Sequence, residues 1–154
     1  MSDPRTPMAT VDLLRDNYAE AAGELLEPLL DLLIAARAAF RGDLDKFAVF
    51  LTVAVRTARS PETRRLSLDQ VLEGAVETYP SLGTNTTSIA ESTGIPRESV
   101  RRKVAELTEA GWVERVGGAL RLTVRASQEL TPLRERVLET AAQMHHVAAR
   151  LEAA

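Results

Sequence analysis

Several features are scarce or missing in this chain of 154 residues. It has no cysteine, which excludes a disulfide framework, a thiolate metal site and a cysteine nucleophile. Aromatic residues make up only 4% of the chain. The longest charge-free apolar run covers residues 47–55, well short of the roughly 20 residues that cross a bilayer. The first seven residues contain no apolar signal core. We therefore expect a cytoplasmic protein of bacterial type with no membrane partner.

The charge of the chain is unevenly distributed. The net charge is −3, and 45% of the residues are apolar, which is enough to form a globular core. Residues 1–46 hold five basic and nine acidic side chains, whereas residues 96–125 hold seven basic and four acidic ones, a local net charge of +3. Because binding depends on the face that a protein presents, this basic segment is compatible with nucleic acid as a partner.

Helical periodicity dominates the first part of the chain. We expect a disordered tail over residues 1–9 and an N-terminal helical region over residues 10–66, in which Pro28 either kinks a long helix or opens a new one. Residues 43–58 favour a buried helix with Asp43 as its N-cap, although their β-branched side chains leave a strand open.

The loop that follows is rich in arginine. Its basic residues are Arg56, Arg59, Arg64 and Arg65. A solvated loop is the favoured interpretation of this cluster, and a supplementary phosphate contact is the alternative. Ser67 and Gln70 then have the spacing of a capping box, which predicts a helix whose apolar face extends to Val76.

One stretch in the second half has a pattern typical of two helices joined by a tight turn. A short helix is predicted over residues 86–92, capped by Asn85 or Thr84. Gly94 suits the positive φ of a sharp turn, and Pro96 suits the start of the next helix.

The second helix of this stretch is amphipathic. Val100, Val104 and Leu107 recur at spacings of four and three, which places them on one buried face, and the helix is expected to end at Gly111. The residues that flank or oppose this face are Glu98, Ser99, Arg101, Arg102 and Ala105.

A β-hairpin is predicted directly after the second helix. Gly117-Gly118 is a two-residue turn signal between two segments of alternating pattern. The register that follows from it pairs Val113 with Leu122, Glu114 with Arg121, Arg115 with Leu120, and Val116 with Ala119. Val113, Leu120 and Leu122 are then expected to cover the helices.

Two helices, a tight turn and a hairpin in this order resemble the winged helix-turn-helix domain of bacterial transcription regulators, particularly MarR-like and GntR-like ones. The residues that carry the resemblance are Ile89-Ala90, Gly94-Ile95, the run from Pro96 to Arg102, Leu107, Gly111-Trp112-Val113 and Gly117-Gly118. It implies a mainly α fold, in which a winged helix-turn-helix domain over residues 67–125 carries one small β-hairpin. N-terminal helices and a C-terminal helix over residues 126–154 would flank this domain and serve dimerisation.

The resemblance also implies double-stranded DNA as a partner. The second helix would enter the major groove, where Arg97, Ser99 and Arg101 point to base edges while Arg102 and Lys103 suit phosphates. A bidentate arginine–guanine pair is worth roughly 1–3 kcal/mol of discrimination.

Further DNA contacts are expected from the first helix and from the wing. The hydroxyl groups of Thr86, Thr87 and Ser88 could hold a phosphate at the start of the first helix. Arg115 and Arg121 could reach the adjacent minor groove or its backbone.

Simpler alternatives remain open for the charged residues. Arg97 and Arg101 could contact phosphates or stay solvated, and the wing arginines could pair with Glu114. Glu98 could accept from cytosine N4, or hold Arg101 or Arg102 through a helical ion pair.

No catalytic pattern stands out in the sequence. There is no phosphate loop and no Ser/His/Asp arrangement. The adjacent residues His145 and His146 point about 100° apart on a helix, so they do not form a two-ligand metal face. We therefore expect no enzyme activity, no catalytic residue, no metal and no cofactor.

Two apolar segments suggest a homodimer. Residues 29–34 cover most of a helix circumference, which is typical of a helix buried on more than one side. The C-terminal segment has an a/d stripe formed by Leu130, Leu133, Val137, Thr140, Met144, Val147 and Leu151. This stripe could pack on the N-terminal helices of the same chain, pair with another subunit, or do both in an intertwined dimer.

The interpretation that follows is a sequence-specific transcriptional regulator that binds DNA as a homodimer. The alternative is a winged-helix protein–protein interaction module without specific DNA binding. A small-molecule effector is also open, because MarR-like proteins often bind small aromatic or phenolic effectors between the N-terminal helices and the winged domain.

Overall fold

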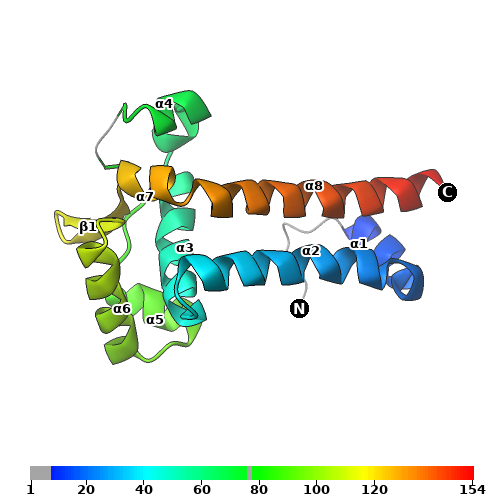
Figure 1. Cartoon of the computed structure of the whole chain (residues 1–154), viewed down its shortest axis with the longest axis horizontal. Coiled ribbons are helices and arrows are strands. Elements are labelled where there is room, and N and C mark those ends of the chain that lie inside the picture. Colours follow the sequence, from blue (N-terminus) through cyan, green and yellow to red (C-terminus); the bar gives the residue numbers. More distant parts are fainter. Residues whose placement is uncertain (1–7, 76–77) are drawn as a thin grey trace. The chain divides into compact units, whose positions relative to one another are not determined.

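The computed structural model describes residues 8–75 and 78–154. These residues form helices and one two-stranded antiparallel sheet, so the mainly α fold with a small hairpin is confirmed (Figure 1). The chain divides into two compact units. We call Ala36–Thr131 the winged unit, and Met1–Ala35 with Pro132–Ala154 the helical unit. Most of the expected tail and Val76 lie outside the described residues.

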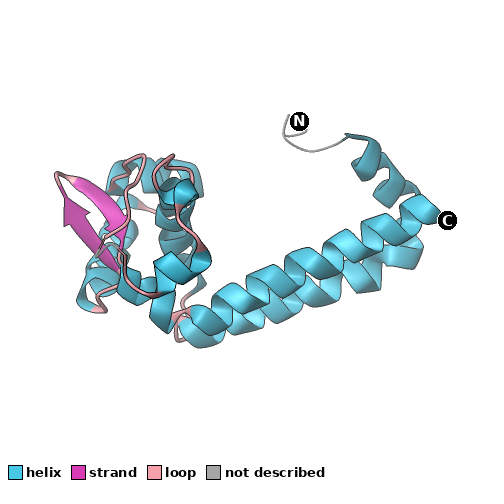
Figure 2. Cartoon of the chain, turned by 90° about the horizontal axis from the view of Figure 1, so that it is seen from above, coloured by secondary structure: helices cyan, strands magenta, loops and turns pink. Residues whose placement is uncertain are grey.

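The helical unit is built from α1 (Met8–Asp16), α2 (Tyr18–Ala39) and α8 (Thr131–Ala153). Figure 2 shows the two long helices side by side. They run in opposite directions, because Arg150 pairs with Glu20 at 2.8 Å whereas Thr140 donates a hydrogen bond to the Pro28 carbonyl at 3.2 Å. None of the described helices is both long and apolar enough to span a membrane.

The N-terminal helices differ from expectation at two points. The side-chain amide of Asn17 donates to the Leu13 carbonyl at 2.9 Å, and the chain breaks there into α1 and α2. A short polar side chain that bonds to the backbone competes with helix continuation. Helix α2 then runs through Pro28 without being divided. Helix α1 begins at Met8, inside the range expected to be a tail.

The core of the helical unit is small. Among the described residues, Ala21, Val147 and Leu151 form a cluster against which Leu13, Leu14 and Leu25 are partly packed, and Leu133 and Thr140 are also buried. The α8 stripe therefore packs in part on helices of the same chain, although Val137 is exposed. Leu25 of α2 takes part in this packing, whereas five other large aliphatic side chains of α2 remain exposed. We call Leu26, Leu29, Leu30, Leu33 and Ile34 the α2 stripe, whose members are 42–57% exposed. A single chain thus leaves one apolar face of α2 uncovered.

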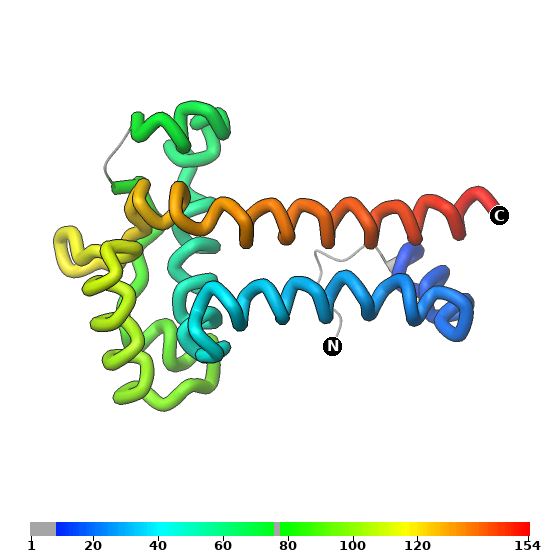
Figure 3. The backbone as a smooth tube through the Cα atoms, in the orientation of Figure 1, coloured from blue at the N-terminus to red at the C-terminus, as the bar shows by residue number. Residues whose placement is uncertain are grey.

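The winged unit contains the remaining elements. These are α3 (Leu44–Ala58), η1 (Thr63–Arg65), α4 (Leu68–Leu72), α5 (Thr86–Thr93), α6 (Arg97–Glu109), β1 (Val113–Val116), β2 (Ala119–Leu122) and α7 (Val124–Glu129). The path from α5 through the tight turn into α6 can be followed in Figure 3. Apolar side chains from α3, α5, α6 and both strands form one core, in a winged-helix-like arrangement.

Helix α3 is the central element of this core. Residues 44–58 form a helix rather than the alternative strand, and the Asp43 carboxylate caps it by accepting from the Lys46 amide at 2.8 Å. Its buried side chains include Val49 and Val53. Because α3 contacts α5, α6 and β2, the winged unit begins at Ala36 and not at the expected residue 67.

An aromatic cluster packs around the start of α3. The ring centroid of Phe40 lies 5.3–5.5 Å from those of Phe47, Phe50 and Trp112, and Phe50 lies 6.2 Å from Trp112. The Trp112 indole N–H donates to Glu129 at 2.7 Å. These contacts join residues 40–50 to Trp112 and, through Glu129, to α7.

Two further boundaries differ from the sequence-based prediction. The capping box of Ser67 and Gln70 is confirmed, but α4 ends at Leu72 because the chain turns at Gly74, which has a φ of +75°. The expected C-terminal helix is divided at Leu130 into α7 and α8, and Thr123 caps α7. Ala126 is buried within the winged unit, so α7 belongs to that unit.

Candidate nucleic-acid interface

The turn between α5 and α6 has the local geometry that the sequence predicts. Asn85 caps α5, and its side chain accepts from the Ser88 amide at 3.0 Å. Gly94 ends the helix with a φ of +73°, a value that a side chain would strain. Helix α6 starts directly after Pro96, and Ile89 is fully buried behind the turn.

The two faces of α6 have different chemistry. Val100, Val104 and Leu107 are buried, as their spacing predicts. The opposite face is exposed and is formed by Arg97, Glu98, Arg101, Arg102 and Ala105, with Ser99 half-buried at its edge. We call the exposed face the outer face of α6. It carries three arginines and Glu98, and the exposed Glu109 follows on the same face at the C-terminal end of the helix.

One carboxylate on the outer face pairs within its own helix. Glu98 accepts from the Arg101 guanidinium at 2.5 Å, which is the i,i+3 alternative considered above. Both side chains are more than 70% exposed, and an exposed pair of this kind contributes about 0–1 kcal/mol. A phosphate can therefore displace Glu98 at small cost. Arg97 and Arg102 have no ion pair or hydrogen-bonded partner for their side chains among the described residues.

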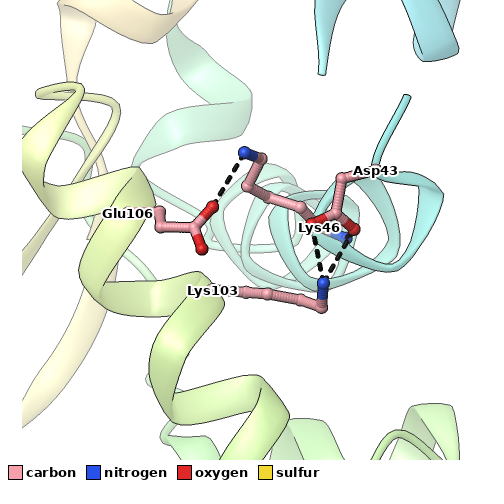
Figure 4. A network of polar contacts seen from close by, with 4 residues as sticks. All are labelled: Asp43, Lys46, Lys103 and Glu106. Atoms are coloured by element: carbon pink, nitrogen blue, oxygen red, sulfur yellow. Dashed lines mark hydrogen bonds and ion pairs between the residues drawn. The ribbon is translucent and has the colours of Figure 1, made fainter. Parts of the chain in front are cut away.

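Lys103 corrects the sequence-based prediction. It was expected to contact phosphate, but its side chain is only 6% exposed and its ammonium lies 2.7 Å from both carboxylate oxygens of Asp43 (Figure 4). The physical reason is its position. Three residues after Val100 and four before Leu107, it falls on the inner face of α6. Lys103 thus fixes the helix to the start of α3 and is not available to DNA.

A second ion pair runs parallel to the first one. Lys46 lies 2.9 Å from Glu106, so each helix supplies one cation and one carboxylate to the network in Figure 4. Burial raises the pKa of Asp43, but hydrogen bonds from Lys103 and from the Lys46 amide, with the two lysine charges, outweigh it and leave the pKa below its ordinary value. The four charges cancel, so the remaining charges of α6 are the exposed Arg97, Glu98, Arg101, Arg102 and Glu109.

A groove connects the outer face of α6 with two neighbouring elements. Thr86 from α5, Arg101 from α6 and Arg115 from β1 all line a hollow of about 520 Å³. Its remaining lining residues are Val104, Ala105, Thr108, Glu109 and Leu120. Three of the predicted site residues, one from each element, therefore share one surface. Thr87 is half-buried and Ser88 is exposed beside Thr86 at the start of α5.

The hairpin has the predicted register, from Val113 opposite Leu122 to Val116 opposite Ala119. Gly117 and Gly118 both have positive φ, which a two-residue turn of this type requires. Arg115 is exposed and folds back so that its guanidinium donates to the Gly118 carbonyl at 3.0 Å.

Arg121 and Glu114 do not form the pair that was considered. Glu114 accepts from the Thr78 hydroxyl at 2.6 Å. Arg121 is half-buried, and its Nε atom is buried without a hydrogen-bond partner among the described residues. Arg115 is therefore the more accessible of the two wing arginines.

The residues that sequence reasoning missed are those that hold α6. Asp43 and Lys46 lie sixty positions before their partners, and no local motif links them. One signal was available for Lys103, because the buried spacing of α6 includes its position. A lysine on an apolar face predicts a buried partner rather than a solvent contact.

Comparison with known proteins returns no match to a family model, to a curated protein or to a solved structure. Within residues 8–75 and 78–154, no three histidine or acidic side chains are grouped so that they could hold a metal ion. What this site can bind therefore has to follow from the charge, exposure and geometry of its own residues.

Proposed function

We propose that this protein is a sequence-specific DNA-binding transcriptional regulator that acts as a homodimer. Helix α6 enters the major groove, and the wing approaches the adjacent backbone or minor groove. The observation that carries the proposal is the outer face of α6, where Arg97, Arg101 and Arg102 are exposed in the first half of the helix, beside the displaceable carboxylate of Glu98. A protruding helix with exposed arginines suits the width of the major groove.

The neighbouring elements support a DNA footprint wider than one helix. The groove joins Arg101 to Thr86 and Arg115. A hydroxyl group at the start of α5 and an arginine on β1 suit phosphates on either side of the base contacts. Lys103 is no part of this footprint, because its charge is already neutralised by Asp43.

The α2 stripe supports the homodimer. Five large aliphatic side chains on one helix face remain 42–57% exposed, and a second copy of the same face would cover them. Two recognition helices in a dimer reach successive major grooves when they lie about 34 Å apart. The same stripe is compatible with another partner chain, which is the observation that favours a protein-interaction module as the second candidate function.

Selection from random DNA tests the proposal. The full chain is incubated with a random duplex library at about 150 mM salt, and the bound duplexes are sequenced. We expect enrichment of a pseudo-palindromic motif, which reflects the two-fold symmetry of a dimer. Recovery of unenriched random sequence would contradict specific DNA binding and favour the interaction module.

The salt dependence of affinity provides a second, residue-level measurement. Arg102→Ala removes one cation of the outer face, so it should weaken binding to all duplexes similarly and reduce the salt slope by about 0.9 per subunit. The matched control is Arg15→Ala, which removes an exposed arginine of α1. An equal effect of both variants would mean that α6 has no special role.

A further inference from the structure

Helix α3 is apolar on two faces, and only one of them is in the core. Val49, Phe50 and Val53 are buried. A second set of residues at helical spacing begins with Ala48 and includes Leu51 and Val55, which are 44% and 39% exposed. These exposed aliphatic side chains lie about one helical turn apart and are not buried in the core of the winged unit.

The second face of α3 forms one wall of a hollow within the winged unit. The hollow has a volume of about 660 Å³, which is in the usual range for small-molecule sites of about 300–1,000 Å³. Helix α3 supplies Ala48, Leu51, Thr52, Val55, Arg56 and Arg59, and the opposite side is formed by Gly83, Thr84, Ser88, Ser92 and Thr93. No aromatic side chain is among these residues.

The charge of this hollow has a single sign. Its lining includes two arginines and no carboxylate, in a chain whose net charge is −3. Arg56 is fixed in place, because its guanidinium donates to the carbonyls of Gly83 at 3.1 Å and Leu82 at 3.3 Å. Its Nη1 atom and the whole Arg59 guanidinium form no hydrogen bond with the described residues, so donors remain for an anion.

We propose that the hollow between α3 and α5 is a binding site for a small organic anion with an aliphatic body, such as a medium-chain carboxylate. The carboxylate lies against Arg56 and Arg59, and the hydrocarbon chain covers Leu51 and Val55. Apolar burial supplies affinity, and the two arginines select the anion over a neutral molecule of the same shape. This site lies wholly within the winged unit and does not depend on DNA binding.

An NMR titration of the full chain with sodium octanoate tests the site in the absence of DNA. The octanoate concentration is kept below the onset of micelle formation, and octanamide serves as the neutral counterpart. We expect saturable shifts of backbone amides in α3 and α5, around Leu51, Val55 and Ser88, and weaker binding of octanamide. Shifts confined to the α2 stripe, equal binding of the two compounds, or shifts that do not saturate would each overturn the proposal.

Substitutions at exposed positions identify the contacts. Arg59→Gln should raise the octanoate dissociation constant roughly fivefold, as expected for one partly exposed charge contact. Val55→Glu, which places a carboxylate against the ligand, should abolish binding. Arg64→Gln is the matched control, because it removes an exposed arginine of η1 outside the lining. Octanoate binding that is unchanged in Arg59→Gln, or that Arg64→Gln weakens equally, would contradict the assigned site.

Discussion

The winged unit and the helical unit differ in how completely they bury their own apolar side chains. In the winged unit, large side chains such as Ile89, Leu107 and Leu120 are almost fully buried. In the described part of the helical unit, a small apolar cluster forms around Ala21, Val147 and Leu151, while the α2 stripe remains exposed. A single chain thus buries a large core in the winged unit, apart from the second face of α3, and leaves a longer apolar stripe uncovered in the helical unit.

This difference shows what an apolar pattern in the sequence predicts and what it leaves open. A periodic apolar pattern predicts that one face of a helix is buried. It does not predict whether the same chain or another chain buries that face. For α6 the cover is α3 of the same chain, whereas α2 has more apolar surface than α1 and α8 cover. We infer that the winged unit is the functional module and that the helical unit completes its core by association.

The largest effect is expected from the core of the winged unit. Leu107→Ala removes a side chain that is 1% exposed, so it should lower the free energy of unfolding by about 2–5 kcal/mol. Urea unfolding of the full chain measures this change. Leu138→Ala on α8 is the matched control, because Leu138 is 52% exposed and its truncation should cost far less. Equal losses of unfolding free energy in the two variants would contradict the difference in burial between Leu107 and Leu138.

A second prediction concerns the α2 stripe. Leu30→Asp places a charge on a side chain that is 57% exposed in the single chain, so folding should be largely unaffected while dimerisation is lost. Each buried leucine contributes about 1.5–3 kcal/mol to an interface. Sedimentation equilibrium measures the mass in solution, with Ala38→Asp as the control, because it adds the same charge at an exposed position on a different face of α2. A wild-type chain that is monomeric at all concentrations would contradict the prediction that a second copy covers the α2 stripe.

The expected effect of the Asp43–Lys103 pair is smaller. Asp43→Asn keeps a good N-cap for α3 but removes the charge that faces Lys103, so we expect a loss of about 1–2 kcal/mol at neutral pH. Urea unfolding against Lys46→Gln, which weakens the neighbouring, partly buried pair with Glu106, provides the control. No loss in Asp43→Asn would show that the pair does not hold α6.

The same pair predicts a pH dependence. The pKa of Asp43 is lowered in the folded state, so its contribution is complete above the unfolded value of about 3.9 and is lost as the pH falls through the folded value. The difference in unfolding free energy between wild type and Asp43→Asn should therefore be constant at pH 5–7 and shrink below about pH 4. A difference that grows with acidification would mean that the folded-state pKa is raised.

Local signals account for the parts of the fold that the sequence predicts correctly. The caps at Asp43, Ser67 and Asn85, the positive φ of Gly94 and the hairpin register all depend on residues within a few positions of one another. Features that depend on distant partners were missed. The position of α3 within the winged unit and the burial of Lys103 follow from contacts across sixty residues.

Some residues of the candidate site could be predicted from the sequence, and others could not. Helical spacing correctly places Arg97, Arg101 and Arg102 on the exposed face, because the turn at Gly94 fixes the phase of α6. Spacing alone does not show that Arg121 is half-buried, since this depends on how the wing packs. Basic composition therefore overestimates the number of side chains that remain free for DNA.

The most direct test of the account is the affinity of wild type and Arg97→Ala for the selected duplex and for a scrambled duplex, measured by fluorescence anisotropy at fixed salt. Removal of a base-contacting arginine should cost roughly 1–3 kcal/mol on the selected duplex per contact and leave scrambled binding nearly unchanged. The account predicts that the ratio of the two affinities falls about tenfold or more in the variant. An unchanged ratio, or a wild-type protein that does not distinguish the two duplexes, would contradict the claim that the outer face of α6 reads DNA sequence.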